Sequence, residues 1–166
     1  MFIRDSVKEE FGKKIKYILD GGTCAIGIES TIVNLTARPT ILRLGGLDIS
    51  KIKKTLGFKM SISTNPKKKI APGQSRLHYS PGIPLRMNVI KPKSDAAFIL
   101  IKKKKIKLNN YYYLSTNGNL NEAARNLYSC LRKIKNKGYK SIDVEKIPNK
   151  GLGRAINDRL DRASKY

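Results

Sequence analysis

The chain has 166 residues, and 35 Lys or Arg against 12 Asp or Glu give it a formal net charge of +23 and an isoelectric point near 10.2. The charge excludes an acidic buffer protein, and a hydrophobic share of 40% is enough for a core, which excludes a wholly disordered basic tail. No apolar stretch reaches the roughly 18 to 20 residues of a membrane-spanning helix, and the first ten residues lack an apolar signal-peptide centre. We therefore expect a cytoplasmic protein with no membrane partner, made of one ordinary domain or two small ones.

The positive charge begins after residue 35. Residues 1–35 are neutral overall, whereas 36–93 carry +12 and 94–166 carry +11. Such a field attracts phosphate groups, on ATP or on RNA, in a salt-dependent way. The alternative is compositional, because 25 of the basic residues are Lys in a chain rich in Ile and Asn, as A/T-rich codons produce. Lysine runs such as 67–69 and 102–105 are more often solvated surfaces than binding sites.

The two cysteines, Cys24 and Cys130, have no Cys or His neighbour at metal-ligand spacing. This argues against a zinc site and against a disulfide framework, so we expect no metal site and two buried thiols. The single histidine, His78, leaves a catalytic Cys/His pair without positive support.

The first third of the chain reads as one α/β unit. Ser6 and Glu9 have the form of a capping box, which predicts a short helix that ends near Phe11. Strands are expected at 14–19 and, with a bulge, at 24–35.

A turn then leads to a short strand at 41–43, and apolar residues at helical spacing predict a helix over 47–56, ended by Gly57. Residues 58–84 contain four prolines and no apolar period, which predicts a linker or an ordered functional loop.

Residues 85–166 alternate between strand and helix patterns. The expected elements are a strand at 86–90, a helix at 95–103 capped by Ser94, a strand at 111–115, a helix ending near Lys137, a strand at 141–144 and a helix over 152–163. Such alternation predicts an α/β fold, with a Rossmann-like, mainly parallel sheet and flanking helices. There is no G-x-G-x-x-G fingerprint, so dinucleotide binding is not implied.

Two features in the first third could carry chemistry. Ser30 and Thr31 place two hydroxyls among apolar neighbours, although such hydroxyls usually satisfy local backbone groups. Arg43 precedes Gly45 and Gly46, which allow close backbone approach, and its guanidinium suits a phosphate or a carboxylate. A surface ion pair is the more common fate of such an arginine.

Two later features also stand apart from packing. The loop APGQSRLHYSPG, residues 71–82, is stiffened by prolines and turned by glycines, so it can present His78 and Tyr79 at a defined place. The segment GLGRAINDRL crowds polar residues on one helix, and a structural network or an interface explains this crowding as well as a site does. These residues are Arg154, Asn157, Asp158 and Arg159.

Four segments, in this order, resemble a known family: ILDGGTCAIGIESTIVNLT, ILRLGGLD, APGQSRLHYSP and IPNKGLGRAINDRLDRAS. They look like the C-terminal part of the bacterial threonylcarbamoyl-AMP synthase family, in its two-domain form with a YrdC-like catalytic domain and a Rossmann-like C-terminal domain. The resemblance runs from about Asp5 to Ala163. It implies that residues 1–57 are the end of the catalytic domain, 58–84 a linker, and 85–166 the C-terminal domain.

The resemblance implies a nucleotidyltransferase that combines L-threonine, bicarbonate and ATP, with Mg²⁺ accompanying the ATP, into threonylcarbamoyl-AMP and pyrophosphate. This is a step toward threonylcarbamoyladenosine in tRNA. By similarity, Ser30 corresponds to a threonine-contacting residue and Arg43 to an ATP-contacting residue, while His78 and Tyr79 lie in a linker motif that closes on the nucleotide. Catalysis of this kind is mostly positioning and charge stabilisation, so no catalytic triad is expected.

The chain also departs from the family pattern. The family's catalytic domain begins far earlier, in a stretch with KxR and SxN motifs that has no counterpart here. Smaller departures are Asn34, Leu44 and Arg76, where many members have Asp, Pro and Tyr. We therefore expect a truncated or split enzyme that is inactive alone and needs an N-terminal half in trans. The alternatives are a non-catalytic fragment that binds double-stranded RNA or tRNA, and a module at 86–166 that docks other tRNA-modification proteins.

Overall fold

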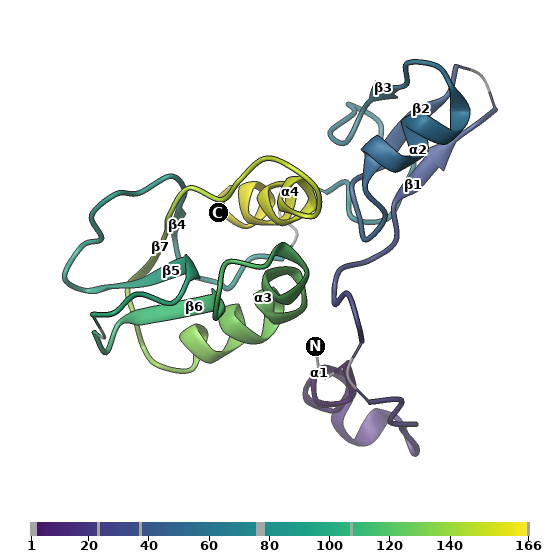
Figure 1. The fold of residues 1–166 in the computed structure, drawn as a ribbon. Coiled ribbons are helices and arrows are strands. Elements are labelled where there is room, and N and C mark those ends of the chain that lie inside the picture. Colours follow the sequence, from purple (N-terminus) through teal and green to yellow (C-terminus); the bar gives the residue numbers. More distant parts are fainter. Residues whose placement is uncertain (1–2, 23, 37, 76–78, 107, 166) are drawn as a thin grey trace.

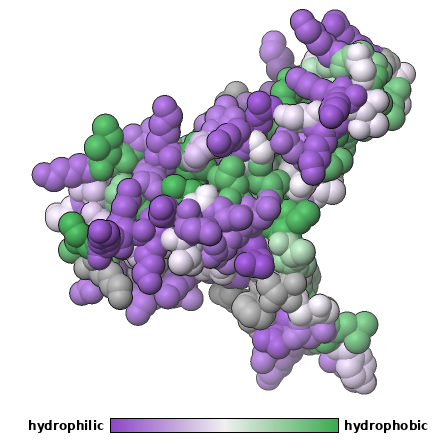
Figure 2. All heavy atoms as spheres, in the orientation of Figure 1, coloured by the Kyte–Doolittle hydropathy of each residue, from purple (hydrophilic) through white to green (hydrophobic). Residues whose placement is uncertain are grey.

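The computed structural model describes residues 3–22, 24–36, 38–75, 79–106 and 108–165. It contains two sheets, one of three strands and one of four, with a short N-terminal helix that lies apart from both (Figure 1). Within these residues no helix combines the length and apolar character needed to cross a membrane. Hydrophilic side chains dominate the face shown in Figure 2, as the high content of charged residues leads one to expect.

The N-terminal segment contains less regular structure than its sequence predicts. Helix α1, Ile3–Phe11, ends where expected and is followed by a 3-10 turn, η1, at Gly12–Lys14. The predicted strand at 14–19 is wrong: Lys14 ends η1, residues 15–19 have no regular structure, and Leu19 is 99% exposed. Of the predicted strand at 24–35, only β1, Ile32–Asn34, is present.

The three-stranded sheet has the order β1-β2-β3. Strand β2, Thr40–Arg43, pairs antiparallel with β1 and parallel with β3, Ser61–Ile62, a strand that lies in the predicted linker. Helix α2, Ile49–Leu56, confirms the predicted helix and its end at Gly57, whose φ of +73° suits glycine. Its Ile49 packs in a small core with two other buried residues, Ile41 and Met60.

The four-stranded sheet is fully parallel, which confirms the predicted architecture. Its order is β4-β7-β5-β6, with β4 at Leu85–Arg86, β5 at Ala96–Lys102, β6 at Tyr111–Ser115 and β7 at Ser141–Val144. Helices α3, Leu120–Lys135, and α4, Gly153–Ala163, lie on the same face of this sheet (Figure 1).

The predicted helix at 95–103 is wrong, because most of this segment is the central strand β5. Residues Ala96 to Leu100 are all buried, so the strand is apolar on both faces. A continuous apolar run lacks the alternation of a half-exposed strand and is compatible with a buried helix as well. The predicted strand at 86–90 is also shorter than expected, and Asn88 there has a φ of +58°.

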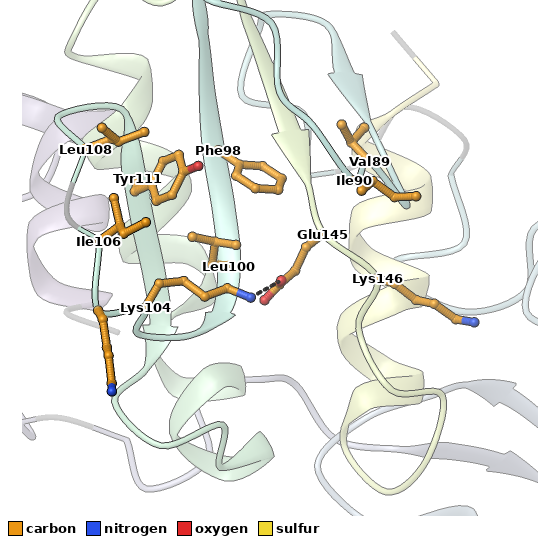
Figure 3. A pocket seen from close by; sticks show the side chains of 11 residues that line it. Val89, Ile90, Phe98, Leu100, Lys104, Ile106, Leu108, Tyr111, Glu145 and Lys146 are labelled. Carbon is orange, nitrogen blue, oxygen red and sulfur yellow. Dashed lines mark ion pairs between the residues drawn. The ribbon is translucent and has the colours of Figure 1, made fainter.

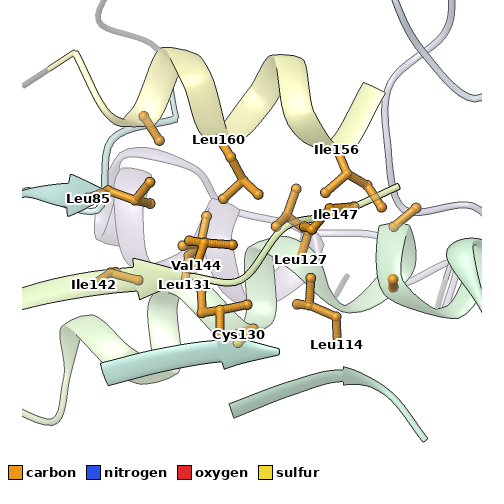
Figure 4. Close-up of a cluster of buried hydrophobic side chains, with 14 of the residues drawn as sticks. Leu85, Leu114, Leu127, Cys130, Leu131, Ile142, Val144, Ile147, Ile156 and Leu160 are labelled. Carbon is orange, nitrogen blue, oxygen red and sulfur yellow. The ribbon is translucent and has the colours of Figure 1, made fainter. Parts of the chain in front are cut away.

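The main core lies between the parallel sheet and its two helices (Figure 4). Leu127, Ile142 and Leu160 come from a helix, a strand and a second helix, and none is exposed. Cys130 is buried, as predicted, and burial raises the pKa of its thiol to about 12. Cys24 is exposed, so the expectation of a buried thiol is wrong for that residue.

Candidate functional site

Ser30 and Arg43 are in direct contact. Arg43, the last residue of β2, donates from Nη2 to Ser30 Oγ at 3.1 Å and from Nε to the Ser30 carbonyl at 3.0 Å. Ser30 is exposed and Arg43 is half-buried. The contact therefore places a hydroxyl and a guanidinium side by side at an accessible surface, where both can meet a polar or anionic ligand.

The glycine pair after β2 makes this contact possible. The Gly46 amide donates to the Glu29 carbonyl at 2.8 Å. A Cβ on Gly45 would lie 2.3 Å from backbone atoms of residues 29–31, which is closer than any real side chain approaches. The predicted close backbone approach beside Arg43 is confirmed, and only glycine fits it.

The loop at residues 71–82 reaches the same contact from the other side. The Pro72 carbonyl accepts a hydrogen bond from Arg43 Nη1 at 3.3 Å. Gln74, only 1% exposed, anchors the loop: its side-chain oxygen accepts from two loop amides, and its Nε2 donates to the Leu42 carbonyl at 3.0 Å. A buried amide with its oxygen and nitrogen both bonded holds the loop against β2.

Tyr79 is held by both helices of the parallel sheet. Its ring stacks on Tyr128 of α3, with centroids 5.4 Å apart, and the guanidinium of Arg159 in α4 lies 5.1 Å from the ring centre. Its φ of +69° is a conformation that side-chain-bearing residues rarely adopt. Burial, together with the hydrogen bond to Glu29, raises the pKa of Tyr79 to about 12.

Glu29, next to Ser30, is the centre of a polar cluster. Its carboxylate accepts from Arg159 Nε and Nη2 at 3.1 Å each and from the Tyr128 hydroxyl at 3.2 and 3.3 Å. Burial alone would raise the pKa of Glu29, but the hydrogen bond from Tyr79 and the charge of Arg159 outweigh it, so the pKa lies below its usual value. The carboxylate is therefore ionised at neutral pH.

Two arginines of α4 connect this cluster to the end of β2 and to the linker by hydrogen bonds. The Arg159 side chain has no exposed surface, and it also donates to the Leu44 carbonyl at 2.8 Å. Arg162, 4% exposed, donates to two carbonyls beyond its own helix, those of Thr64 and Ser75. The C-terminal helix thus holds the Ser30 segment, the end of β2 and the linker in one arrangement.

The predicted site residues fall into three groups. Ser30, Arg43 and Tyr79 are brought into one region, linked through Glu29 and residues 71–75. Thr31 Oγ1 donates to the Leu47 carbonyl at 2.7 Å, so it serves the backbone. His78 and Arg76 lie outside the described residues. The part of the chain that the structure describes has no group of three His, Cys, Asp or Glu side chains that could hold a metal ion.

Sequence reasoning missed several of the residues that build the region, among them Glu29 and Arg162. Gln74 gave no signal beyond its place in the loop motif, and Tyr128 was interpreted only as part of the helix that became α3. Of the three alternatives for the crowded polar residues of α4, a structural network agrees with their contacts, because Arg159 and Arg162 both pair with Asp158, at 2.6 and 3.1 Å.

Comparison with known protein families accounts for almost the whole chain. Residues 47–165 match the family described as "Threonylcarbamoyl-AMP synthase, C-terminal domain". Residues 3–45 match a second family, described as "Telomere recombination". The two matches meet at the glycine pair after β2.

Individual relatives agree with these matches. The chain is 32% identical to a threonylcarbamoyl-AMP synthase of Pyrococcus abyssi and 28% identical to one of Bacillus subtilis, in each case over 96% of this chain and 52% of the relative. A crystal structure of P. abyssi Sua5 complexed with L-threonine superposes with a TM-score of 0.81 at 31% identity, over 96% of this chain and 52% of that one. The chain spans about half the length of the curated relatives it matches.

Proposed function

Since this chain belongs to the threonylcarbamoyl-AMP synthase family, we propose that it supplies the C-terminal half of such an enzyme. The reaction would convert L-threonine, bicarbonate and ATP into threonylcarbamoyl-AMP, pyrophosphate and water, in the cytoplasm, as a step in the modification of tRNA. Because the products are an adenylate and pyrophosphate, the chemistry is nucleotidyl transfer at the α-phosphate. Magnesium belongs to the proposal as part of the Mg–ATP substrate complex.

The observation that carries the proposal is the contact of Arg43 with Ser30 and with the linker loop. Three separate segments of the sequence, each suspected of chemistry, meet at one guanidinium. In the proposed roles the Ser30 hydroxyl binds the polar groups of L-threonine and Arg43 neutralises a phosphate of ATP. The L-threonine in the related P. abyssi structure supports a threonine site in this family.

The linker loop would close the site. We propose that Tyr79, with His78 beside it in sequence, lies over the nucleotide and excludes water from the labile carbamoyl adenylate. The anchoring of Tyr79 by Tyr128 and Arg159, and of residues 70–74 by Gln74, supports a loop that is held at both of its described ends. Positioning of this kind lowers a barrier without any covalent intermediate.

The other half of the site would come from the part of the relatives that this chain does not span. We propose that the KxR and SxN motifs of that part hold ATP and threonine, and that the chain alone is inactive. Exposed apolar side chains in the first region, such as those of Tyr17 and Leu19, support a partner surface there.

Reconstitution tests this function. The purified chain would be mixed with, or fused to, the N-terminal half of the P. abyssi relative, and pyrophosphate release would be measured with and without threonine and bicarbonate. We expect release only when both halves and both substrates are present. Arg43→Ala should reduce it at least a hundredfold, an effect of about 2.7 kcal/mol, whereas Arg38→Ala, at an exposed arginine of the same sheet region, should not.

Ser30→Ala is the second variant, and its threonine KM should rise with a smaller effect on the KM for ATP. Circular dichroism would show that each variant is folded. Pyrophosphate release by the 166-residue chain alone, or full activity of the Arg43→Ala variant, would overturn the proposal.

The second candidate function is binding of double-stranded RNA. It is favoured by the +12 charge of residues 36–93, which contain a single acidic residue. Fluorescence anisotropy with a labelled RNA duplex distinguishes the two functions. Duplex binding that falls steeply with salt and is unchanged by Arg43→Ala would support the RNA function, and no binding at 50 mM salt would eliminate it.

A further inference from the structure

The parallel sheet has a second face, opposite α3 and α4, that no helix covers among the described residues. On this face β5 presents Phe98 and Leu100, and the segments before and after β5 fold over them. A cavity of about 740 Å³ lies between these segments (Figure 3). Its size is within the range of sites for small organic ligands.

The cavity has an apolar floor and apolar walls. The rings of Phe98 and Tyr111 meet edge to face, with centroids 5.5 Å apart, and Leu100 lies beside them. The walls are formed by Val89 and Ile90 on one side and by Ile106 and Leu108 on the other.

Three wall residues are left largely in solvent. Ile90 is 97% exposed, Ile106 71% and Leu108 50%. Removing such apolar side chains from water is favourable, so three of them around one hollow favour an apolar occupant.

The charge at the cavity is positive. Lys104, Lys105 and Lys146 line it together with a single carboxylate, that of Glu145. One oxygen of this carboxylate accepts the Ile101 amide and the other pairs with Lys104 at 3.4 Å, so this pair neutralises Lys104 and leaves the charges of Lys105 and Lys146 in excess. The occupant that complements an apolar slot with a basic mouth is therefore an apolar molecule with a negative charge.

The charged mouth of this site lies at the carboxyl ends of β5 and β7, and parallel α/β sheets usually bind ligands at such strand ends. Strands β5 and β7 are neighbours, and the chain after β5 folds onto the open face while the chain after β7 leads to α4 on the other. The crevice at the carboxyl ends of strands whose connections diverge in this way is the usual ligand position. Lys104 and Glu145, which come just after these two strands, meet there (Figure 3).

We propose that this cavity binds a planar aromatic molecule that carries a negative charge, with its ring on Phe98 and Leu100 and its anionic group at the lysine-lined mouth. The cavity lies on the four-stranded sheet, which Figure 1 shows apart from β1 and β2, the strands next to Ser30 and Arg43. The proposal does not rest on the proposed enzymatic function.

Two probes with one ring and opposite charge test the proposal. The full chain, labelled with ¹³C at Ile and Leu methyl groups, would be titrated with 2-naphthoate and with naphthalen-2-ylmethylamine. We expect saturable shifts for 2-naphthoate at the methyls of Ile90, Leu100, Ile106 and Leu108, and at least fivefold weaker binding of the amine. Equal affinity for the two probes, or shifts spread over the whole chain, would overturn the proposal.

Substitutions at exposed wall residues complete the test. Ile106→Asp and Leu108→Asp add a negative charge without opening the core, and each should weaken naphthoate binding at least tenfold. Leu35→Asp is the matched control, because Leu35 is 67% exposed and belongs to the first sheet region. Binding that survives both wall variants, or that the control abolishes equally, would also contradict the proposed site.

Discussion

The two sheets of this chain are stabilised in different ways. The parallel sheet shares with α3 and α4 a core of 19 buried residues, whereas the three-stranded sheet has a cluster of three, counted over the described parts of the chain. One of the 19 is Ile28, which comes from the segment before β1. The segment that contains Ser30, residues 27–30, therefore takes its position from the core of the parallel sheet and not from that of the three-stranded sheet. We call these four residues the Ser30 segment.

Several contacts support this dependence. Gly27, with a φ of +70°, approaches α3 so closely that a Cβ there would lie 2.6 Å from the Arg125 Cα. Ile28 enters the main core, and Glu29 pairs with Arg159. The parallel sheet and its two helices thus hold residues 27–29, directly before Ser30, in place.

The largest expected difference between the two regions is in how much the free energy of unfolding falls when a side chain is shortened to Ala. Leu160→Ala removes a fully buried side chain from the main core and should lower the free energy of unfolding by about 2 to 5 kcal/mol. Leu19→Ala removes a side chain that is 99% exposed and should change it by less than about 0.5 kcal/mol. Urea unfolding of both variants measures the contrast, and equal losses would contradict it.

The next effect concerns the close approach of Gly45 to the backbone of residues 29–31. Gly45→Ala places a methyl group against backbone atoms and should destabilise the chain by about 1 to 3 kcal/mol, because backbone atoms cannot move aside easily. Gly21→Ala is the control, since nothing lies within 4 Å of a Cβ at that position. Unfolding free energies that are the same for both variants would show that the close approach is not present in solution.

A smaller effect should appear on acidification. The pKa of Glu29 in the folded chain lies below its usual value near 4.5, so its stabilising contribution is fully present above about pH 4.5. The contribution is lost as the pH falls through the folded pKa. Glu29→Gln should therefore be less stable than the wild-type chain at pH 7, with the difference narrowing toward pH 3. A difference that is constant over this range would contradict the ion pair with Arg159.

Sequence patterns predicted the parallel sheet, α2, α3 and α4, because these elements have helical periodicity or clear strand segments. They misassigned β5, since a strand buried on both faces has no alternation to reveal it. The strand expected at 14–19 failed for a different reason: local β propensity forms a strand only when a neighbour supplies hydrogen bonds.

The site was predictable in part. Ser30, Arg43 and the linker loop each carried unusual residues, and the structure links them through Arg43. The Glu29–Arg159 pair was not predictable, because 130 positions separate its members and neither has a distinctive spacing. Tertiary packing alone brings such residues together.

Hydrogen exchange in the Arg159→Met variant tests most directly whether Arg159 holds residues 27–30 in place. The Gly46 amide, which donates to Glu29, reports on the segment, and Arg154→Met, on the same helix, is the control. We predict that Arg159→Met speeds exchange at Gly46 at least tenfold while the amides of β5 and β7 stay protected, and that Arg154→Met changes neither. Unchanged exchange at Gly46 in the Arg159→Met variant would show that Arg159 does not hold this segment in place.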